Sequence, residues 1–438
     1  MSLIKSGLFA FLNRGSIAVF GFINFFILIR ILPKEDFGAW VLFLSVATLL
    51  ESIRKAFIYN PLIRFLNSSD ENQSNSIIAS SLILNIGSSL VTFIFLWVAG
   101  YYLSVFWEIP QLNTMFRIYS IGQLVYTFVI HFNSLSEANL QFLPTLISNL
   151  FHRIIFLIFF LVIHFSYGLT IEILSILYVF GITTAAITAS ILGYKYSKMG
   201  IWKMDEILAQ FNYGKFTFGT NISSMIFKNT DSWMLGSIIN KVAVASYNPA
   251  IRISNLFEVP LGAISSVVFP NMVKRIKEKG LDEARTLYEQ AVGLSLCVLF
   301  PFVLLGMIFS ESIVLLIAGE KYLGSASILQ VTLLYALIVP FNRQFGITMN
   351  AIGKAHINFS VLLINTVLNA LLNYFFIKQL GIIGAAYATL ISYFIILVVS
   401  ELILYRTLKV RLSNIGLSYL KSHVTLINLL KRRRGNHE

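Results

Sequence analysis

The chain has 438 residues, of which 57% are apolar and only 12% are charged, and its mean hydropathy is +0.77. Because soluble domains carry about 25% charged residues, this composition excludes a soluble globular enzyme. The net charge of +13 would suggest a nucleic-acid partner in a soluble protein, but in a membrane protein the position of each charge matters more than the sum. One cysteine and six histidines without ligand spacing predict neither a disulfide framework nor a metal site or cofactor.

Twelve mostly apolar runs are long enough to cross a hydrocarbon core, which takes about 20 helical residues. The first run is not a cleavable signal peptide, because it is too long, carries Arg14 and reaches Pro33 without a small-residue cleavage site. We therefore predict an all-α integral membrane protein with about twelve transmembrane helices. The runs lie near residues 7–32, 37–58, 76–106, 113–135, 142–165, 171–194, 214–239, 243–270, 287–309, 325–352, 356–378 and 381–405.

The orientation follows from the distribution of lysine and arginine between the loops. With the N-terminus inside, 23 of the 33 fall in cytoplasmic segments, six in outer loops and four inside the runs. The cytoplasmic group includes Arg54 and Lys55, near the inner end of the second run, and Arg153. This bias predicts a cell (inner) membrane protein with both termini in the cytoplasm, and it explains the positive charge without a nucleic-acid partner.

The segment after Lys409 combines scattered apolar residues with a basic end, Lys431-Arg432-Arg433-Arg434. One interpretation is an amphipathic helix that lies on anionic membrane lipids. A solvated basic tail and a thirteenth span are the alternatives.

The runs fall into two groups of six, on either side of a polar segment near residues 195–213. An even number in each half means that both halves enter the membrane from the same side, so an internal repeat would be parallel. Weak similarity at a constant offset, for example 31–34 with 238–241, supports a duplication. We predict two six-helix bundles at 1–196 and 214–406 with a central cleft, a cytoplasmic linker at 197–213 and a basic cytoplasmic or interfacial tail at 407–438.

Three segments carry recognisable motifs in order along the chain. They are Arg30-Ile31-Leu32-Pro33-Lys34-Glu35-Asp36-Phe37-Gly38; Tyr247-Asn248-Pro249-Ala250-Ile251-Arg252 with Pro260 and Val268-Phe269-Pro270; and Leu380-Gly381-Ile382-Ile383-Gly384-Ala385-Ala386-Tyr387-Ala388-Thr389-Leu390-Ile391-Ser392. The second fits the pattern Y-x-x-A-x-R…P…F-P. Together they resemble the polysaccharide flippases of the multidrug/oligosaccharidyl-lipid/polysaccharide exporter superfamily, over roughly residues 1–410.

The resemblance implies a flippase that moves undecaprenyl-pyrophosphate-linked oligosaccharides from the inner to the outer leaflet for O-antigen, capsule or related polymers. It also implies a cationic cavity that suits a pyrophosphate, alternating access with ion antiport, and polysaccharide polymerase machinery as a further partner. The chain lacks clear thirteenth and fourteenth spans, unlike the lipid II flippases of the superfamily. This difference argues against transport of a peptidoglycan precursor.

Four cations lie inside the runs, where an ionisable group costs at least about 2.5–3.5 kcal/mol and is by default a functional hypothesis. They are Arg14, Lys228, Arg252 and Arg343. Arg252 belongs to the family pattern, and Arg343 lies about nine residues, or ~13 Å, from the inner end of its run. Guanidinium groups can hold a pyrophosphate through bidentate hydrogen bonds. We predict that the four bind substrate, with snorkelling as the alternative for Arg14.

Three acids inside the runs are predicted to bind a proton or Na⁺ when the substrate site is empty, and so to couple transport to an ion gradient. They are Glu51, Asp231 and Glu258. The first shares a helix face with Arg54, three positions away. Asp231 follows Lys228 by three positions, so the alternative is that these two residues form a purely structural ion pair. Arg252 and Glu258 point about 120° away from each other and need separate partners.

Other functions fit the sequence less well. No Walker A motif, catalytic triad or large soluble loop is present, so we do not expect an enzyme. A drug/cation antiporter of the same superfamily would favour acids over arginines. A membrane-embedded polysaccharide polymerase or ligase would carry a large outer loop, whereas the longest one here, residues 310–324, is short. A scramblase-like lipid scaffold is a third alternative.

Overall fold

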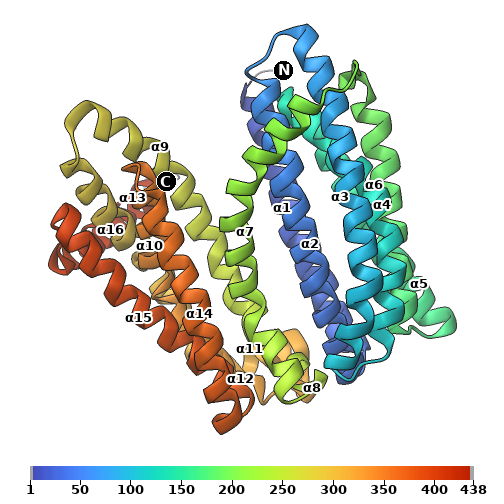
Figure 1. Cartoon of the computed structure of the whole chain (residues 1–438). Helices are drawn as coiled ribbons and strands as arrows, with labels where there is room; N and C mark the ends of the chain where they lie inside the picture. The colour runs from blue at the N-terminus through green and yellow to red at the C-terminus, as the bar shows by residue number, and fades with distance from the viewer. Residues whose placement is uncertain (1–2, 435–438) are drawn as a thin grey trace. The chain divides into compact units, whose positions relative to one another are not determined.

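The structure is a computed structural model that describes residues 3–434, and all the regular structure in this range is helical. Within it, sixteen α-helices and three short 3-10 turns (η1–η3) cover all twelve predicted runs (Figure 1). Nine helical segments of the described chain have the length and hydropathy of a membrane span. The remaining three predicted spans are the more polar helices α2 (Lys34–Leu66), α4 (Gln111–Ala138) and α7 (Met204–Ile238). The prediction of an all-α membrane protein is confirmed.

The chain divides into two compact units, and unit 1 consists of Met1–Asn229 and Asn240–Ala245. Within it α4 packs against α2, α3 and α6, while α5 packs against α6 and α1. The further helices of this unit are α1 (Leu3–Ile31), α3 (Glu71–Phe106), α5 (Phe142–Tyr167) and α6 (Ile171–Gly193), followed by η1 (Tyr194–Tyr196). Figure 1 shows α3, α4 and α6 running side by side.

Glycines allow the helices of unit 1 to approach closely. A Cβ atom at Gly122 of α4 would lie 2.8 Å from Cγ2 of Val179 on α6. A Cβ atom at Gly38 of α2 would overlap the carbonyl oxygen of Lys241, so only glycine allows the segment Asn240–Ala245 to pack this closely against α2. Small residues serve the same purpose in many membrane helix bundles, where close backbone packing replaces the hydrophobic driving force between helices.

Unit 2 consists of Thr230–Ile239 and Ser246–Glu438. In it α14 packs against α15, α10 against α9 and α16, and α12 against α15. Besides the end of α7, its helices are α8 (Lys241–Ser254, shared with unit 1), α9 (Glu258–Lys279), α10 (Asp282–Ile308), α11 (Ser310–Ala318), α12 (Ser325–Ala336), α13 (Val339–Ala351), α14 (Ala355–Leu380), α15 (Ile382–Leu408) and α16 (Leu412–Arg434), with η3 (Glu320–Tyr322) between α11 and α12.

Two predicted spans of unit 2 are broken helices. The eighth run is interrupted by the 3-10 turn η2 (Asn255–Phe257), and the tenth is divided into α12 and α13 just before Pro340. Proline is favoured in the first turn of a helix because it has no N–H to donate, which explains why α13 restarts there. Such breaks are tolerated at membrane depth where protein or water satisfies the backbone.

The segment between the two groups of six helices is shorter than the predicted linker. Only residues 197–203 lack regular structure, and α7 begins at Met204. Residues of α7 up to Asn229 belong to unit 1, and those from Thr230 belong to unit 2. The division into bundles at 1–196 and 214–406 with a cleft between them stays a prediction.

The predicted tail is the helix α16, and its first half is packed against α10. The buried carboxylate of Glu289 accepts hydrogen bonds from the backbone N–H of Arg411 (3.0 Å) and from Nδ2 of Asn414 (3.1 and 3.2 Å). The two helices touch at Gly293, where a Cβ atom would lie 2.8 Å from the backbone nitrogen of Tyr419. The start of the tail is therefore part of unit 2, and its contact with anionic lipids stays a prediction.

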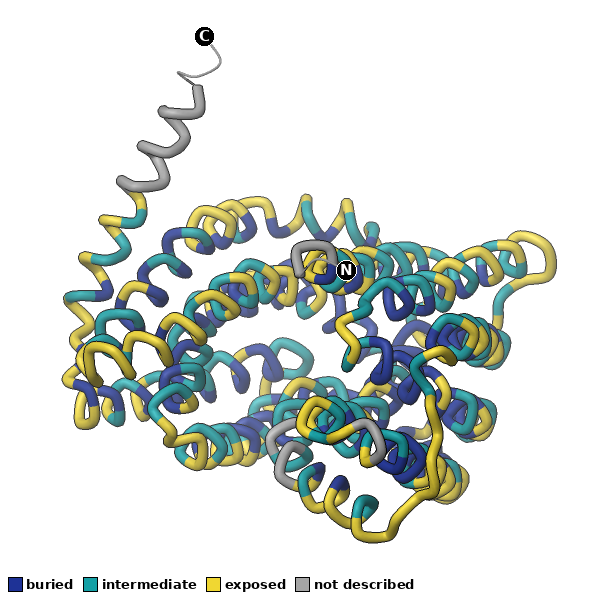
Figure 2. The backbone as a smooth tube through the Cα atoms, turned by 90° about the horizontal axis from the view of Figure 1, so that it is seen from above, coloured by how far each residue is buried: buried dark blue, intermediate teal, exposed yellow. Residues whose placement is uncertain are grey.

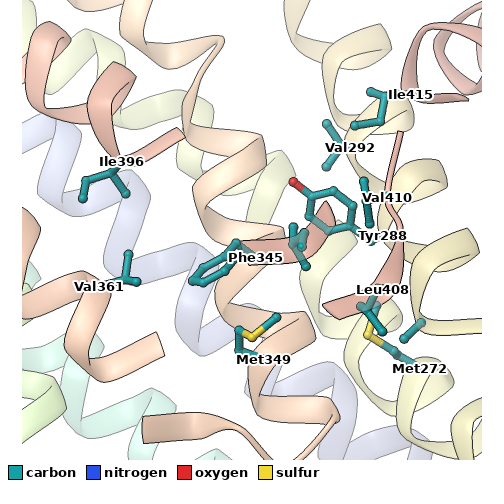
Figure 3. Packing of buried hydrophobic residues seen from close by; sticks show 12 residues of the cluster. Met272, Tyr288, Val292, Phe345, Met349, Val361, Ile396, Leu408, Val410 and Ile415 are labelled. Carbon is teal, nitrogen blue, oxygen red and sulfur yellow. The ribbon is translucent and has the colours of Figure 1, made fainter. Parts of the chain in front are cut away.

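Figure 3 shows the apolar core that holds this region together. Tyr288 and Val292 of α10 pack beside Val410 and Ile415, which flank the start of α16. Fully burying a side chain of this size contributes about 1.5–3 kcal/mol in water. The same core contains Leu408, just before the turn at Lys409 with its left-handed φ of 58°, so it holds the chain on both sides of this turn.

Most helices bury one face and expose the other, as the alternating colours of Figure 2 show. On α3 the exposed face is apolar: Val91 is 69% exposed and Ile94 is 61% exposed. Buried positions of the same helix include Ser81 and Asn85, both 0% exposed. This apolar outside and partly polar inside is the pattern of a helix that faces lipid on one side.

Candidate functional site in the polar interiors of the two units

A completely buried arginine lies at the centre of the polar interior of unit 1. Arg54 of α2 is 1% exposed, and its Nη1 donates to the backbone oxygen (2.7 Å) and Oε1 (2.9 Å) of Gln123. Its Nη2 donates to Oδ1 of Asn85 (2.8 Å) and Oγ1 of Thr127 (2.9 Å). α2 continues to Leu66, twelve residues beyond Arg54, and places Arg54 between α3 and α4; its position at the inner rim stays a prediction.

Glu51 binds neutral groups. Its Oε1 accepts hydrogen bonds from the hydroxyls of Tyr119 (2.8 Å) and Tyr178 (3.4 Å). Both rings belong to an aromatic cluster in which Trp40 lies 6.0 Å from Tyr178, centroid to centroid. Arg54 and Glu51 thus bind different partners, although they share a face of α2.

Unit 1 contains a polar cavity of about 420 Å³ between α1, α2, α4 and α5, here called the unit 1 cavity. Two cations and one carboxylate line it: Arg14, Lys55 and Glu137. The hydroxyl of Tyr59 donates to Glu137, and Lys55 forms a side-chain hydrogen bond with Tyr126. Its other lining residues are Ala10, Asn13, Ile17, Val129, Ile130, Asn133, Phe142, Thr145 and Asn149.

Sequence reasoning missed two cations of this interior. Lys55 and Arg153 were counted with the cytoplasmic cations and were not considered as site residues, whereas the structure places them within the helices α2 and α5. Arg153 is eleven positions after Phe142, roughly 16 Å along the helix, and Lys55 is the same distance before Leu66. The sequence does contain a signal for the longer helix: the first turn-forming residues after Lys55 are residues 67–70, well beyond the expected end of the run. Of the predicted substrate cations, only Arg14 lines the unit 1 cavity.

Two side-chain hydrogen bonds hold amides of the unit 1 cavity in place. Nδ2 of Asn149 donates to Oδ1 of Asn13 (2.9 Å), and Oγ of Ser148 donates to Oδ1 of Asn133 (3.1 Å). Each pair joins two helices, α5 with α1 and α5 with α4. These bonds fix amide donors and acceptors at the wall of the cavity, which is the arrangement that hydroxyl-rich ligands need.

In unit 2, Asp231 occupies a different kind of site. This carboxylate is 8% exposed and accepts hydrogen bonds from Tyr247 (2.6 Å), Asn373 (2.8 Å) and Thr389 (3.0 Å to each oxygen). Asn369 extends the network by donating to Thr389 (2.9 Å). All these donors are neutral. The carboxylate therefore has hydrogen bonds but no counter-charge within its own network of described residues.

Glu258 and Arg343 were predicted to have separate functions, but the structure joins them in an ion pair between α9 and α13. Arg343 also donates from Nε to Oγ of Ser265 (3.0 Å). The two side chains are 40% and 31% exposed, so water still reaches the pair. As reasoned from helix geometry, Glu258 finds a partner other than Arg252.

The remaining predicted cations lie at exposed positions of their helices: Lys228 on α7 and Arg252 on α8. Their joint role in one substrate site stays a prediction. Among the residues that the structure describes, no group of three or more His, Cys, Asp or Glu side chains could hold a metal ion. The polar interiors thus offer cations and amides in unit 1, and in unit 2 a carboxylate among neutral donors and an ion pair.

The chain matches two known families. The family described as "Polysaccharide biosynthesis protein" matches residues 3–275, and the family MatE matches residues 217–375.

Similar proteins include the uncharacterized membrane protein MJ1068 of Methanocaldococcus jannaschii, 31% identical over 42% of this chain and 37% of its own length. The probable low-salt glycan biosynthesis flippase Agl15 of Haloferax volcanii is 22% identical over 42% of this chain and 39% of its own. The chain thus spans less than two fifths of the length of these two relatives. The capsular polysaccharide biosynthesis protein CapF of Staphylococcus aureus is 21% identical over 90% of this chain and 98% of its own.

Solved structures share the fold. An inward-facing multidrug resistance MATE family transporter of the MOP superfamily has a TM-score of 0.78 at 14% identity, covering 96% of this chain and 98% of the other. The lipid II flippase MurJ, in an inward closed conformation, has a TM-score of 0.74 at 15% identity, covering 98% and 93%. From the family match over residues 3–275, the chain belongs to the polysaccharide biosynthesis protein family, the polysaccharide flippases of the multidrug/oligosaccharidyl-lipid/polysaccharide exporter (MOP) superfamily.

Proposed function

We propose that this protein flips lipid-linked oligosaccharides across the cell (inner) membrane, with both termini in the cytoplasm, for the synthesis of a surface polysaccharide such as O-antigen or capsule. The observation that carries the proposal is the unit 1 cavity, which combines Arg14 and Lys55 with hydrogen-bonded amides. Its volume of about 420 Å³ is in the range of small-molecule sites and accommodates a pyrophosphate with part of a sugar. The names of Agl15 and CapF agree with a glycan cargo.

In the proposed mechanism, Arg14 and Lys55 bind the pyrophosphate that joins undecaprenol to the first sugar. A guanidinium and an ammonium supply charge-assisted hydrogen bonds to the phosphate oxygens. Arg252, Arg343 and Lys228 remain as the additional cations predicted from the sequence. Arg343 is paired with Glu258, so its contact with phosphate requires that this pair opens during alternating access.

The amides of the unit 1 cavity are proposed to bind sugar hydroxyls next to the pyrophosphate. Asn13, Asn133 and Asn149 present both donors and acceptors, as sugar hydroxyls require. Glu137, held by Tyr59, supplies a further acceptor. A carboxylate beside two cations also lowers the excess positive charge of the empty cavity from two to one.

Asp231 is proposed as the principal site of ion coupling. A buried carboxylate surrounded by neutral donors is stabilised when it takes up a proton or Na⁺. Oδ1 of Asn373 is buried without a hydrogen-bond partner among the described residues, and such an orphaned acceptor costs about 1–3 kcal/mol. A bound cation would use this oxygen together with the carboxylate and Thr389. Glu51, satisfied by two tyrosines, is a second acid of the same type in unit 1.

A drug/cation antiporter is the second candidate, because the MATE family transporter shares the fold. The cations of the unit 1 cavity favour the anionic cargo instead. We also propose anionic lipids as partners of α16, through its basic end, and the polymerase machinery as the consumer of the flipped units.

The test uses cells in which this protein is the sole flippase for its polymer. Lys55→Ala and Arg14→Ala should each reduce surface polymer at least about tenfold, the loss that ~1.4 kcal/mol of binding free energy gives. Lipid-linked units should accumulate inside. Lys378→Ala, an exposed cation of unit 2, is the matched control and should leave polymer unchanged. Normal polymer from both cavity variants at normal membrane abundance would contradict the proposal.

A further inference from the structure

A second cavity of about 350 Å³ lies at one end of unit 1, and it shares no lining residue with the unit 1 cavity. It is formed where α2 and α4 end, where α3 begins, and where the chain leaves α6. We call it the end cavity. Its lining residues are Leu66, Asn67, Ser74, Asn75, Ile78, Ala138, Asn139, Lys195, Tyr196 and Lys198.

The charge of the end cavity is one-sided. Lys195 and Lys198 line it, and none of its lining residues is an acid. Lys195 also lies 4.9 Å above the ring of Tyr196, a contact that holds its ammonium near the cavity wall. Two ammonium groups at one concave site attract an anion, and a phosphate bears the charge density that lysine binds well.

The end cavity also offers acceptors. Asn67 and Asn139 cap the ends of α2 and α4 by donating from Nδ2 to the oxygens of Ile63 and Leu135, at 2.9 Å each. This geometry uses one of the two N–H donors of each amide and leaves the Oδ1 atoms to accept hydrogen bonds. A ligand that matches this wall therefore carries hydroxyl donors in addition to an anionic group.

Contacts within unit 1 preform the end cavity. The N–H of Gly200 donates to the backbone oxygen of Asn75 (2.9 Å), and Ser80 bonds to the backbone of Lys203 (3.0 and 3.3 Å). These bonds fasten the segment that carries both lysines to α3. The floor is apolar, because Leu66, Ile78 and Tyr196 belong to a hydrophobic cluster beneath it. A preformed wall loses little entropy on binding.

We propose that the end cavity binds the headgroup of an anionic glycerophospholipid that carries hydroxyls, as phosphatidylglycerol does. Lys195 and Lys198 neutralise the phosphodiester, while the oxygens of Asn67 and Asn139 accept hydrogen bonds from the glycerol hydroxyls. The three segments around the cavity are those that the charge bias assigns to the cytoplasmic side, where anionic lipids attract basic residues. The site is separate from the proposed cargo site and stands without it.

The test uses the full-length protein in phosphatidylcholine nanodiscs with added phosphatidylglycerol, and counts retained lipids by native mass spectrometry. The double variant Lys195→Gln/Lys198→Gln should retain at least about fivefold less phosphatidylglycerol, since one basic residue near a membrane surface corresponds to about that factor. Lys274→Gln/Lys277→Gln removes two exposed lysines of α9 and is the matched control. Equal retention by the wild type and the Lys195/Lys198 variant overturns the proposal.

Two further measurements test which part of the lipid is recognised, and whether the ligand is a lipid or a soluble phosphate ester. Phosphatidylmethanol has the same charge without hydroxyls and should be retained several-fold less than phosphatidylglycerol; equal retention refutes the role of Asn67 and Asn139. Soluble sn-glycerol 1-phosphate should compete only weakly, because it lacks the acyl chains that rest in the bilayer. Binding of the soluble ester as tight as that of the lipid would overturn the lipid source. A melting temperature of the double variant in pure phosphatidylcholine within about 2 °C of wild type shows that it is folded.

Discussion

Arg343 and Glu258 bind each other between α13 and α9, so a cation and an acid that the sequence assigned to different functions form one neutral pair. Because the two charges neutralise each other, the pair changes which ionisable groups of unit 2 lack a counter-charge. Of the two acids of unit 2 predicted to couple ions, it leaves Asp231, rather than Glu258, without a cationic partner in its network of described residues. It also means that removing the charge of either residue leaves the charge of the other without its partner.

The first prediction concerns this pair. Glu258→Gln should change stability by no more than about 1 kcal/mol, because partly exposed ion pairs contribute little. Arg343→Ala should reduce surface polymer at least about tenfold, if its guanidinium contacts phosphate during transport. The measurements are thermal unfolding of the purified proteins and polymer in cells. Equal losses of polymer in the two variants would assign the pair a structural role only.

The second prediction concerns Arg54, whose removal leaves buried acceptors on Gln123, Asn85 and Thr127 without donors. Each orphaned group costs about 1–3 kcal/mol, so Arg54→Ala should strongly reduce the folded protein in the membrane. Arg252→Ala, at an exposed position, should leave that abundance unchanged. Quantitative blotting of the membrane fraction checks both. Normal abundance of Arg54→Ala would show that water or a neighbour replaces the lost donors.

The third prediction concerns ion coupling. Asp231→Asn keeps the size of the side chain and its contact with Thr389 but removes the charge that takes up a cation. We expect transport that no longer responds to the proton or Na⁺ gradient, measured as flipping in proteoliposomes with imposed gradients. Glu258→Gln serves as the control and should keep the response. A gradient response that survives in Asp231→Asn would move the coupling site elsewhere, with Glu51 as the next residue to change.

The fourth prediction concerns Arg252. Arg252→Lys keeps the charge but loses the planar fork of the guanidinium, so polymer should fall; Arg252→Ala should lower it further. Membrane abundance must be measured alongside. Undiminished polymer in cells that carry Arg252→Ala at normal abundance would exclude a substrate contact, whereas lost polymer with lipid-linked units inside would support it.

The fifth prediction is topological. A cysteine at Glu311, at an exposed position of α11, should react with an impermeant thiol reagent from outside, and one at Lys277 should not. The native Cys297 is 3% exposed and gives little background. The reverse labelling pattern would invert the assignment of both termini to the cytoplasm.

The sequence was sufficient for the fold because helix length and hydropathy are local properties. Each of the twelve predicted runs is helical, even where Pro340 divides one of them. The contacts between helices in the interior could not be predicted in the same way. Asp231 finds partners 142 and 158 positions away, at Asn373 and Thr389, and no periodicity within one helix indicates such pairs.

Prediction of the site residues also depended on where each helix ends, and sequence patterns locate helix ends poorly. The second run was expected to end at residue 58, whereas α2 continues to Leu66. The eight further residues extend the helix by roughly 12 Å, so Arg54 and Lys55 lie farther from its end than the run suggested. The end cavity depends on the same point, because Leu66 and Asn67 form part of its wall.

The surroundings of Arg54 have a consequence for how the protein is made. Its three partners follow it by 31, 69 and 73 residues in the chain. At 5–20 residues per second, the ribosome needs roughly 4–15 s after Arg54 before the last of them, Thr127, has been synthesised. During that interval a lone guanidinium on α2 cannot face lipid cheaply. The nascent helix must therefore stay beside the insertion machinery or water until α3 and α4 arrive, so that these three helices enter the bilayer as one assembly step.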